Sequence, residues 1–76
     1  MPKDSYVASL LKAGQDKIIQ KVGEETIEVI IAAKNKNKKK MVYEVADLLF
    51  HVLVLLANSD ISPQEILDEL EKRNNG

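Results

Sequence analysis

Apolar residues along this chain recur at spacings of three and four, and nowhere do they alternate with polar residues as in a strand. That periodicity is typical of helices, and the breaks in it show where each helix should end. Gly14, the polar segment 35–38 and the segment 58–60 are the three breaks. We therefore expect four helices, over residues 6–13, 17–34 and 39–57 and from Pro63 to near the C-terminus, and an all-α fold.

Polar residues that can cap helices precede each expected start. Asp4 or Ser5 would cap the first helix and Asp16 the second, because short polar side chains accept hydrogen bonds from free backbone N–H groups. The signal before the last helix is stronger. Ser62 stands at the cap position, and Glu65 follows three residues later, as in a capping box.

The two long helices are apolar on more than one side. With successive residues placed about 100° apart, one stripe of the second helix contains Ile18, Val22, Thr26, Val29 and Ala33, with Ile27 and Ile31 roughly opposite. In the third helix one face contains Val45, Leu49, Val52 and Leu56, while Phe50 and Val54 point elsewhere. Helices of this kind are buried in a large core or between subunits. A chain of 76 residues cannot form a large core, so we expect a small helical bundle completed by homodimerisation.

Composition supports this picture and narrows the class of protein. Apolar residues make up 45% of a chain that has no cysteine to staple a small core, which again favours self-association. The net charge of −1 does not indicate a nucleic-acid-binding protein. The longest apolar run, residues 52–57, is far shorter than the roughly 20 residues that span a bilayer. We expect a cytoplasmic protein that forms a single all-α domain over residues 1–76, with no nucleic-acid or membrane partner.

Acidic residues occur where the helices are otherwise apolar. Glu24, Glu25 and Glu28 lie in the second helix, and Glu44 and Asp47 lie in the third. A spacing of three places side chains on one helix surface, about 5–6 Å apart. Carboxylates gathered beside an apolar stripe repel one another and lose solvation, so they require a positive partner. Hard oxygen ligands without cysteine favour Mg²⁺, with Mn²⁺ as an alternative.

The same charged residues are also compatible with simpler roles. Glu24 and Glu28 could be solvated, with Glu25 paired to Lys21 four residues earlier. Lys21 could neutralise the acidic cluster or hold a phosphate group of a substrate. His51, on the same side of its helix as Asp47, could be a structural residue or a catalytic one.

Three segments of the chain closely resemble the phosphoribosyl-ATP pyrophosphatase family. They are Lys21-Val22-Gly23-Glu24-Glu25 followed by Glu28-Val29-Ile30, the run from Tyr43 to His51 (YEVADLLFH), and Ser5-Tyr6-Val7-Ala8 with Leu10-Leu11. The acidic pattern alone is shared with the wider MazG-like group of all-α NTP pyrophosphatases. The motif Lys21–Glu25 and the run that ends at His51 are more specific for the phosphoribosyl-ATP pyrophosphatase family. The resemblance extends from about Ser5 to Arg73.

The resemblance implies Mg²⁺-dependent hydrolysis of phosphoribosyl-ATP to phosphoribosyl-AMP and pyrophosphate by a dimeric helical bundle. It implies that the Mg²⁺ ligands are Glu25, Glu28, Glu44 and Asp47. Glu24, Glu25 and Glu28 would be the catalytic carboxylates, with Glu24 at or beside the metal. The residues that we expect to bind substrate are Lys21, Ser5, Tyr6 and His51.

One departure and two alternatives accompany this assignment. Members of the family usually carry a helix before the Ser-Tyr segment, whereas this chain begins almost at that segment. It is therefore expected to be either a naturally short form or a chain without an upstream piece, which could complete the subunit interface or the substrate pocket. The same acidic site could instead serve a house-cleaning pyrophosphatase for dUTP or another NTP. A helical oligomerisation module without enzyme activity is the other alternative, and it predicts no response to Mg²⁺.

Overall fold

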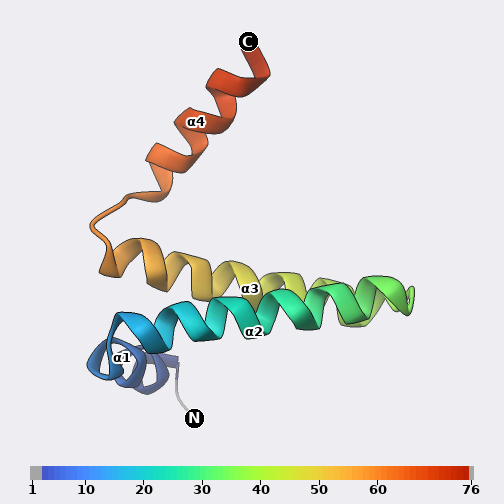
Figure 1. Ribbon diagram of the computed structural model, residues 1–76. Coiled ribbons are helices and arrows are strands. Elements are labelled where there is room, and N and C mark those ends of the chain that lie inside the picture. Colours follow the sequence, from blue (N-terminus) through green and yellow to red (C-terminus); the bar gives the residue numbers. More distant parts are fainter. Residues whose placement is uncertain (1–2, 76) are drawn as a thin grey trace.

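The computed structural model describes residues 3–75, which form four helices joined by short turns (Figure 1). These are α1 (Lys3–Ala13), α2 (Gln15–Lys34), α3 (Lys38–Asn58) and α4 (Pro63–Asn75). No strand occurs among the described residues. The prediction of a small all-α fold with four helices is confirmed.

Two of the predicted caps are wrong. Helix α1 already includes Lys3, so Asp4 and Ser5 lie inside the helix and do not cap it. Gly14, not Asp16, is the N-cap of α2, and Asp16 lies in the first turn. Gly14 has a φ of 100°, which glycine adopts without steric cost. The chain can therefore turn sharply at this one residue, and α2 begins two residues earlier than expected.

The remaining turns follow local side-chain chemistry. Asn37 caps α3 by accepting a hydrogen bond from the Lys40 N–H at 3.0 Å, so α3 starts one residue before the predicted position. Before α4, the Ser62 N–H donates to Glu65 Oε2 at 2.8 Å, and the Glu65 N–H donates to Ser62 Oγ at 3.4 Å. The predicted capping box is confirmed.

Helices α2 and α3 lie side by side as an antiparallel hairpin, and α1 packs against α2 near its start (Figure 1). The hydrophobic core sits where these three helices meet. Leu10, Ile18 and Val54 are buried there, one from each helix. Tyr6, Val7, Phe50 and Leu55 are half-buried and pack against this cluster.

The hairpin brings defined positions of α2 and α3 to the same level. Ile18 meets Val54 in the core, and seven residues closer to the turn, on each helix, Glu25 meets Asp47. Seven residues are nearly two helical turns, so both pairs lie on the facing sides of the hairpin. The core thus fixes the level at which the acidic residues of the two helices face each other.

The buried side of each long helix differs from the predicted stripe. On α2 the buried residues are Ile18, Glu25 and Ala32, whereas Thr26 and Ala33 are exposed. On α3 the buried residues are Glu44, His51 and Val54, whereas Val45 and Leu49 are exposed. The more polar side of α3 faces α2, and its more apolar side is left uncovered within the chain.

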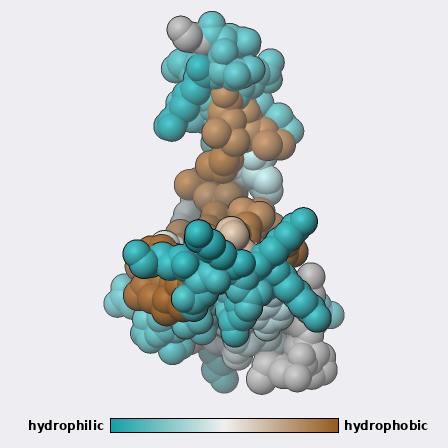
Figure 2. Space-filling view, turned by 90° about the vertical axis from the view of Figure 1, so that its right-hand side faces the viewer, coloured by the Kyte–Doolittle hydropathy of each residue, from teal (hydrophilic) through white to brown (hydrophobic). Residues whose placement is uncertain are grey.

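Helix α4 extends away from the hairpin and has no buried residue (Figure 1). Figure 2 shows apolar side chains continuing from α4 down to the hairpin. A groove of about 420 Å³ lies there, lined by Leu49, Val52, Leu53, Leu56, Pro63, Ile66, Leu67 and Leu70. By length and composition α3 could also span a membrane, a test that the core helices of soluble proteins pass as well. Its Glu44 and His51 are instead buried within the chain.

Candidate metal centre

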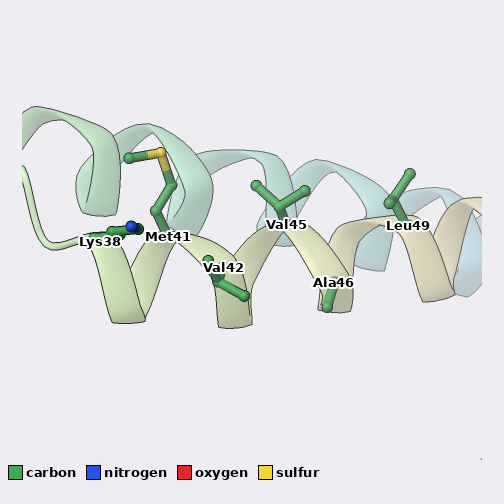
Figure 3. Close-up of a pocket in the computed structure, with 6 residues that line it drawn as sticks. All are labelled: Lys38, Met41, Val42, Val45, Ala46 and Leu49. Carbon is green, nitrogen blue, oxygen red and sulfur yellow. The ribbon is translucent and has the colours of Figure 1, made fainter.

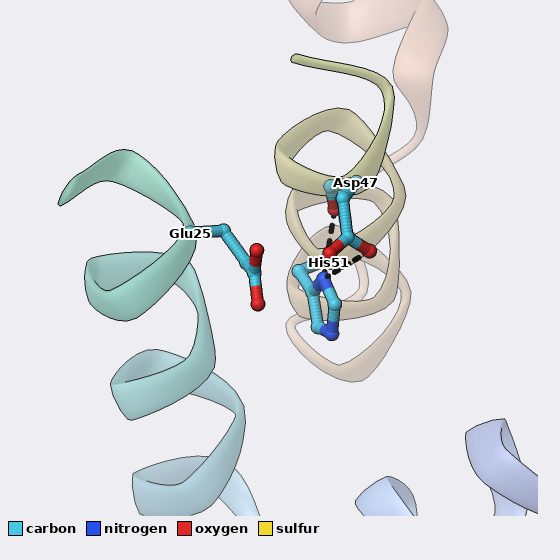
Figure 4. Close-up of side chains that lie close together, drawn as sticks. All are labelled: Glu25, Asp47 and His51. Carbon is cyan, nitrogen blue, oxygen red and sulfur yellow. Dashed lines mark hydrogen bonds and ion pairs between the residues drawn. The ribbon is translucent and has the colours of Figure 1, made fainter. Parts of the chain in front are cut away.

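Three side chains with metal-binding groups converge between α2 and α3. Glu25 reaches from α2 toward Asp47 and His51, which lie one turn apart on α3 (Figure 4). Each offers one ligand atom, and these atoms all lie within 4.8 Å of one another. Glu25 and His51 are buried and Asp47 is half-buried. These three residues, called the close group below, therefore bring two carboxylates together at the edge of the core.

The charge on Glu25 is unfavourable in this setting. Burial raises the pKa of Glu25, and a hydrogen-bonding contact with Asp47 and the charge of Asp47 raise it further. The Lys21 ammonium, 3.4 Å from Glu25 Oε1, opposes these effects but does not cancel them. A cation placed between the two carboxylates would relieve the repulsion.

Lys21 forms ion pairs with two neighbouring carboxylates of its own helix. Its Nζ lies 3.3 Å from Glu24 Oε1 and 3.4 Å from Glu25 Oε1. Burial lowers the pKa of Lys21, but hydrogen bonds to Glu24 and Glu25 outweigh it, and the net pKa is raised. Lys21 thus stays charged and neutralises part of the acidic cluster, one of the two roles expected for it.

Glu24 differs sharply from its neighbour Glu25. It is exposed, and its Oε2 accepts a hydrogen bond from Gln20 Nε2 at 2.8 Å. That bond, together with the contact with Lys21, lowers the pKa of Glu24. Glu24 is therefore a stable anion at the open side of the site. Gln20 was not among the predicted site residues, although its i, i+4 spacing to Glu24 could have indicated it.

Glu28 and Glu44 lie outside the close group. Each is three residues nearer the turn than its partner in the group, Glu25 on α2 or Asp47 on α3. Glu28 is exposed, while Glu44 is buried and lies 4.0 Å from the Lys40 ammonium. The four predicted ligands thus lie in two adjacent layers along the hairpin. Glu25 and Asp47 form one layer, and Glu28 and Glu44 form the layer nearer the turn. Only Glu25 and Asp47 are brought together directly.

His51 and Tyr6 are engaged with each other. His51 is 2% exposed, its Nε2 lies 2.7 Å from Tyr6 Oη, and its Nδ1 lies 2.8 Å from the Asp47 carbonyl oxygen. The Tyr6 ring also stacks on Phe50 with a centroid separation of 6.1 Å. Ser5, one residue earlier on α1, is exposed.

The donor set of the site suits a hard divalent cation. Glu25 and Asp47 offer carboxylate oxygens, and among the described residues Lys21 is the cation that contacts Glu25. Mg²⁺ prefers such oxygens and keeps several water molecules and phosphate oxygens in its shell. The residues present therefore fit a hard divalent cation such as Mg²⁺.

A second apolar hollow, which shares Leu49 with the α3–α4 groove, has no part in this chemistry. It has a volume of about 400 Å³ and runs along the outer side of α3, where Met41, Val45 and Leu49 project in one direction (Figure 3). Lys38 is its one charged lining residue. Its lining includes none of the carboxylates of the candidate site.

Comparison with known proteins agrees with this chemistry. The sequence model of a family described as phosphoribosyl-ATP pyrophosphohydrolase matches residues 1–74. Phosphoribosyl-ATP pyrophosphatase of Geobacter sulfurreducens is 55% identical over 73 residues, which cover 96% of this chain and 68% of that protein. The protein of the same name from Leptospira biflexa is 52% identical over 73 residues, covering 96% and 79%. That from Neisseria meningitidis is 53% identical over 72 residues, covering 95% and 67%. The chain belongs to the phosphoribosyl-ATP pyrophosphohydrolase family.

Proposed function

We propose that this chain is a cytoplasmic enzyme that hydrolyses phosphoribosyl-ATP to phosphoribosyl-AMP and pyrophosphate, the second step of histidine biosynthesis. Membership of the family supports the substrate. The observation that carries the mechanism is the buried Glu25 facing Asp47 across the hairpin, because two carboxylates held this close call for a cation. Mg²⁺ is the proposed cofactor, and Mn²⁺ is expected to substitute for it.

Four carboxylates are proposed to hold the metal. Glu25 and Asp47 form the inner pair, and Glu28 and Glu44 contribute from the adjacent layer of the hairpin. Bound there, Mg²⁺ would neutralise phosphate charge and promote attack by water. Glu24 is proposed to orient that water and accept its proton, because it is exposed, adjacent to Glu25 and held ionised by Gln20 and Lys21.

Contacts to the substrate are proposed for Lys21 and Ser5, neither of which is buried. The Lys21 side chain is 23% exposed, so its ammonium is accessible to a phosphate oxygen from its place beside Glu24. Ser5 is exposed on α1, next to Tyr6, which reaches His51. Tyr6 and His51 were also expected to bind substrate, but their mutual hydrogen bond favours a different role, in which they orient Asp47.

A substrate panel tests this function. With saturating Mg²⁺, phosphoribosyl-ATP should be cleaved far faster than dUTP, dCTP or ATP, with pyrophosphate as a product. Glu25→Gln should lower this turnover by orders of magnitude, because it removes a ligand while keeping the shape of the side chain. Equal or better turnover of a free NTP would move the chain to the house-cleaning pyrophosphatases.

The parent protein also allows a test of the non-enzymatic alternative. An oligomerisation module whose acidic residues are only solvated should show no stabilisation by Mg²⁺. A metal site in the folded state should raise the melting temperature as the Mg²⁺ concentration rises.

A further inference from the structure

We infer that Tyr6 and His51 are a positioning pair that orients Asp47 for the cation and that neither residue binds the cation or the substrate directly. The inference rests on the proposed function, because it assigns the task of Asp47 to metal binding. Its evidence comes from the contacts of the two nitrogens of a single imidazole ring.

The hydrogen-bond partners of His51 define its tautomer. Nδ1 lies 2.8 Å from the Asp47 carbonyl oxygen, which can only accept, so Nδ1 must carry the proton and donate. In the neutral ring Nε2 is then the acceptor, and the Tyr6 hydroxyl donates a hydrogen bond to it, with 2.7 Å between Oη and Nε2. Neither nitrogen has a lone pair left for a metal ion. Of the three converging groups, only the two carboxylates remain as ligands.

The Nδ1–H group also lies beside the Asp47 side chain. It is 3.5 Å from Asp47 Oδ1, so one ring nitrogen faces both the backbone and the carboxylate of the same residue. A ring held in this place restricts the rotation of the Asp47 carboxylate. Groups that orient metal ligands in this way typically change metal affinity or activity by about 10–100-fold when they are removed.

Tyr6 fixes the ring from the other side and connects the site to α1. Its phenol ring stacks on Phe50, and the His51 ring stands edge-on to both aromatic rings, with centroids 5.6 Å from Tyr6 and 5.3 Å from Phe50. His51 is 2% exposed within this cluster, so it is shielded from solvent. Through Tyr6, α1 therefore holds the imidazole in place and, through the imidazole, Asp47.

The tautomer can be measured directly, because His51 is the only histidine in the chain. Nitrogen-15 NMR of the metal-free parent should show one neutral imidazole with Nδ1 protonated and Nε2 accepting a hydrogen bond. Adding Mg²⁺ should leave both nitrogens in that state. A ring protonated at Nε2 alone, or one whose nitrogens exchange freely between tautomers, would overturn the inference.

Variants test the positioning role with a matched control. Tyr6→Phe removes only the hydroxyl and keeps the stacked ring, whereas Tyr43→Phe makes the same change at an exposed position, where the side chain is 67% exposed. Tyr6→Phe should raise the Mg²⁺ concentration needed for half of the thermal shift about tenfold. At saturating Mg²⁺ its KM for phosphoribosyl-ATP should equal that of the parent. Tyr43→Phe should change neither quantity.

Substitutions of the imidazole provide a rescue test. His51→Asn offers an amide N–H where Nδ1–H was, so it should retain more of the Mg²⁺ response than His51→Ala. A raised KM with an intact Mg²⁺ response in Tyr6→Phe would identify Tyr6 as a substrate contact and overturn the positioning role alone. If the parent itself shows no Mg²⁺ shift, the proposed metal function fails and the positioning role fails with it.

Discussion

At the scale of single residues, adjacent glutamates have opposite environments. Glu24 is exposed and its pKa is lowered by Gln20 and Lys21, whereas burial and the neighbouring Asp47 raise the pKa of Glu25. One step along a helix rotates a side chain by about 100°, which is enough to move a carboxylate from solvent to the hairpin interior. The proposed division of labour, with Glu25 as ligand and Glu24 as base, follows from that difference.

This contrast predicts how amide variants affect stability without metal. A raised folded-state pKa means that the stabilisation due to protonated Glu25 is complete below its unfolded pKa and is lost as the pH rises through its folded pKa. Glu25→Gln keeps a neutral side chain, so at neutral pH it should melt at the same temperature as the parent or higher. Glu24→Gln is the control, and it should gain nothing because the Glu24 pKa is lowered.

With Mg²⁺ present, the parent is expected to become more stable than Glu25→Gln, the reverse of the order without metal. At a Mg²⁺ concentration about 100 times Kd, the parent should gain about 2.7 kcal/mol of unfolding free energy. Glu25→Gln and Asp47→Asn should lose most of this gain, and Glu28→Gln reports whether the adjacent layer contributes. Thermal melts with and without Mg²⁺ provide the measurement. Amide variants that keep the full Mg²⁺ shift would show that the proposed ligand set is wrong.

At the scale of elements, α4 depends on its own sequence more than the other helices do. It has no buried residue, and its start is fixed by the capping box of Ser62 and Glu65. Packing therefore contributes little to α4 within one chain, and local hydrogen bonds contribute most. The hairpin of α2 and α3 is instead stabilised by packing, because both helices contribute buried residues to it.

Removal of the cap should therefore destabilise α4 alone. Ser62→Ala is expected to cost about 1 kcal/mol of helix stability. Amide hydrogen exchange should become faster in α4 and stay unchanged in α2 and α3. Ser9→Ala is the control, since the Ser9 hydroxyl only donates to the Tyr6 carbonyl oxygen on an exposed helix surface. An equal acceleration of exchange in all helices would contradict a local role for the cap.

At the scale of the whole molecule, apolar surface exceeds what one chain covers. Only Leu10, Ile18, Ala32 and Val54 are buried apolar residues among those described, whereas Leu49, Leu53 and Leu67 are about half exposed or more. These three leucines line the apolar groove between α3 and α4, and Leu49 also lines the hollow along α3. Contiguous apolar surface of this kind is typical of subunit interfaces.

We accordingly predict a homodimer in which a second copy covers this face. Sedimentation equilibrium at micromolar concentration should give an oligomeric mass for the parent. Leu49→Glu should shift the protein toward monomer, because it places a charge in both apolar hollows. Leu11→Glu introduces the same charge at an exposed leucine of α1, outside both hollows, and should leave the mass unchanged. A folded, stable parent monomer would disprove the dimer.

The sequence by itself determined the helices, the Ser62 capping box and the acidic residues at spacings of three. These features depend on contacts within a few residues, which local sequence encodes. The family motifs around Glu25 and Asp47 likewise required no structure. The caps of α2 and α3 were the local exceptions. Gly14 begins α2 through its positive φ and not through a side-chain hydrogen bond, and Asn37 is one of several polar residues in the turn before α3.

Only the tertiary structure decided which side of each helix is buried. Periodicity gives the angle of Val45 or Glu44 around its own axis but not the direction of the neighbouring helix, and a helix apolar nearly all round has no unique inner side. The packing of α3 on α2 turned Glu44, His51 and Val54 inward. It also gave both His51 nitrogens a partner and left Glu28 at the surface. These outcomes depend on contacts between residues far apart in the chain, which the pattern along one helix does not contain.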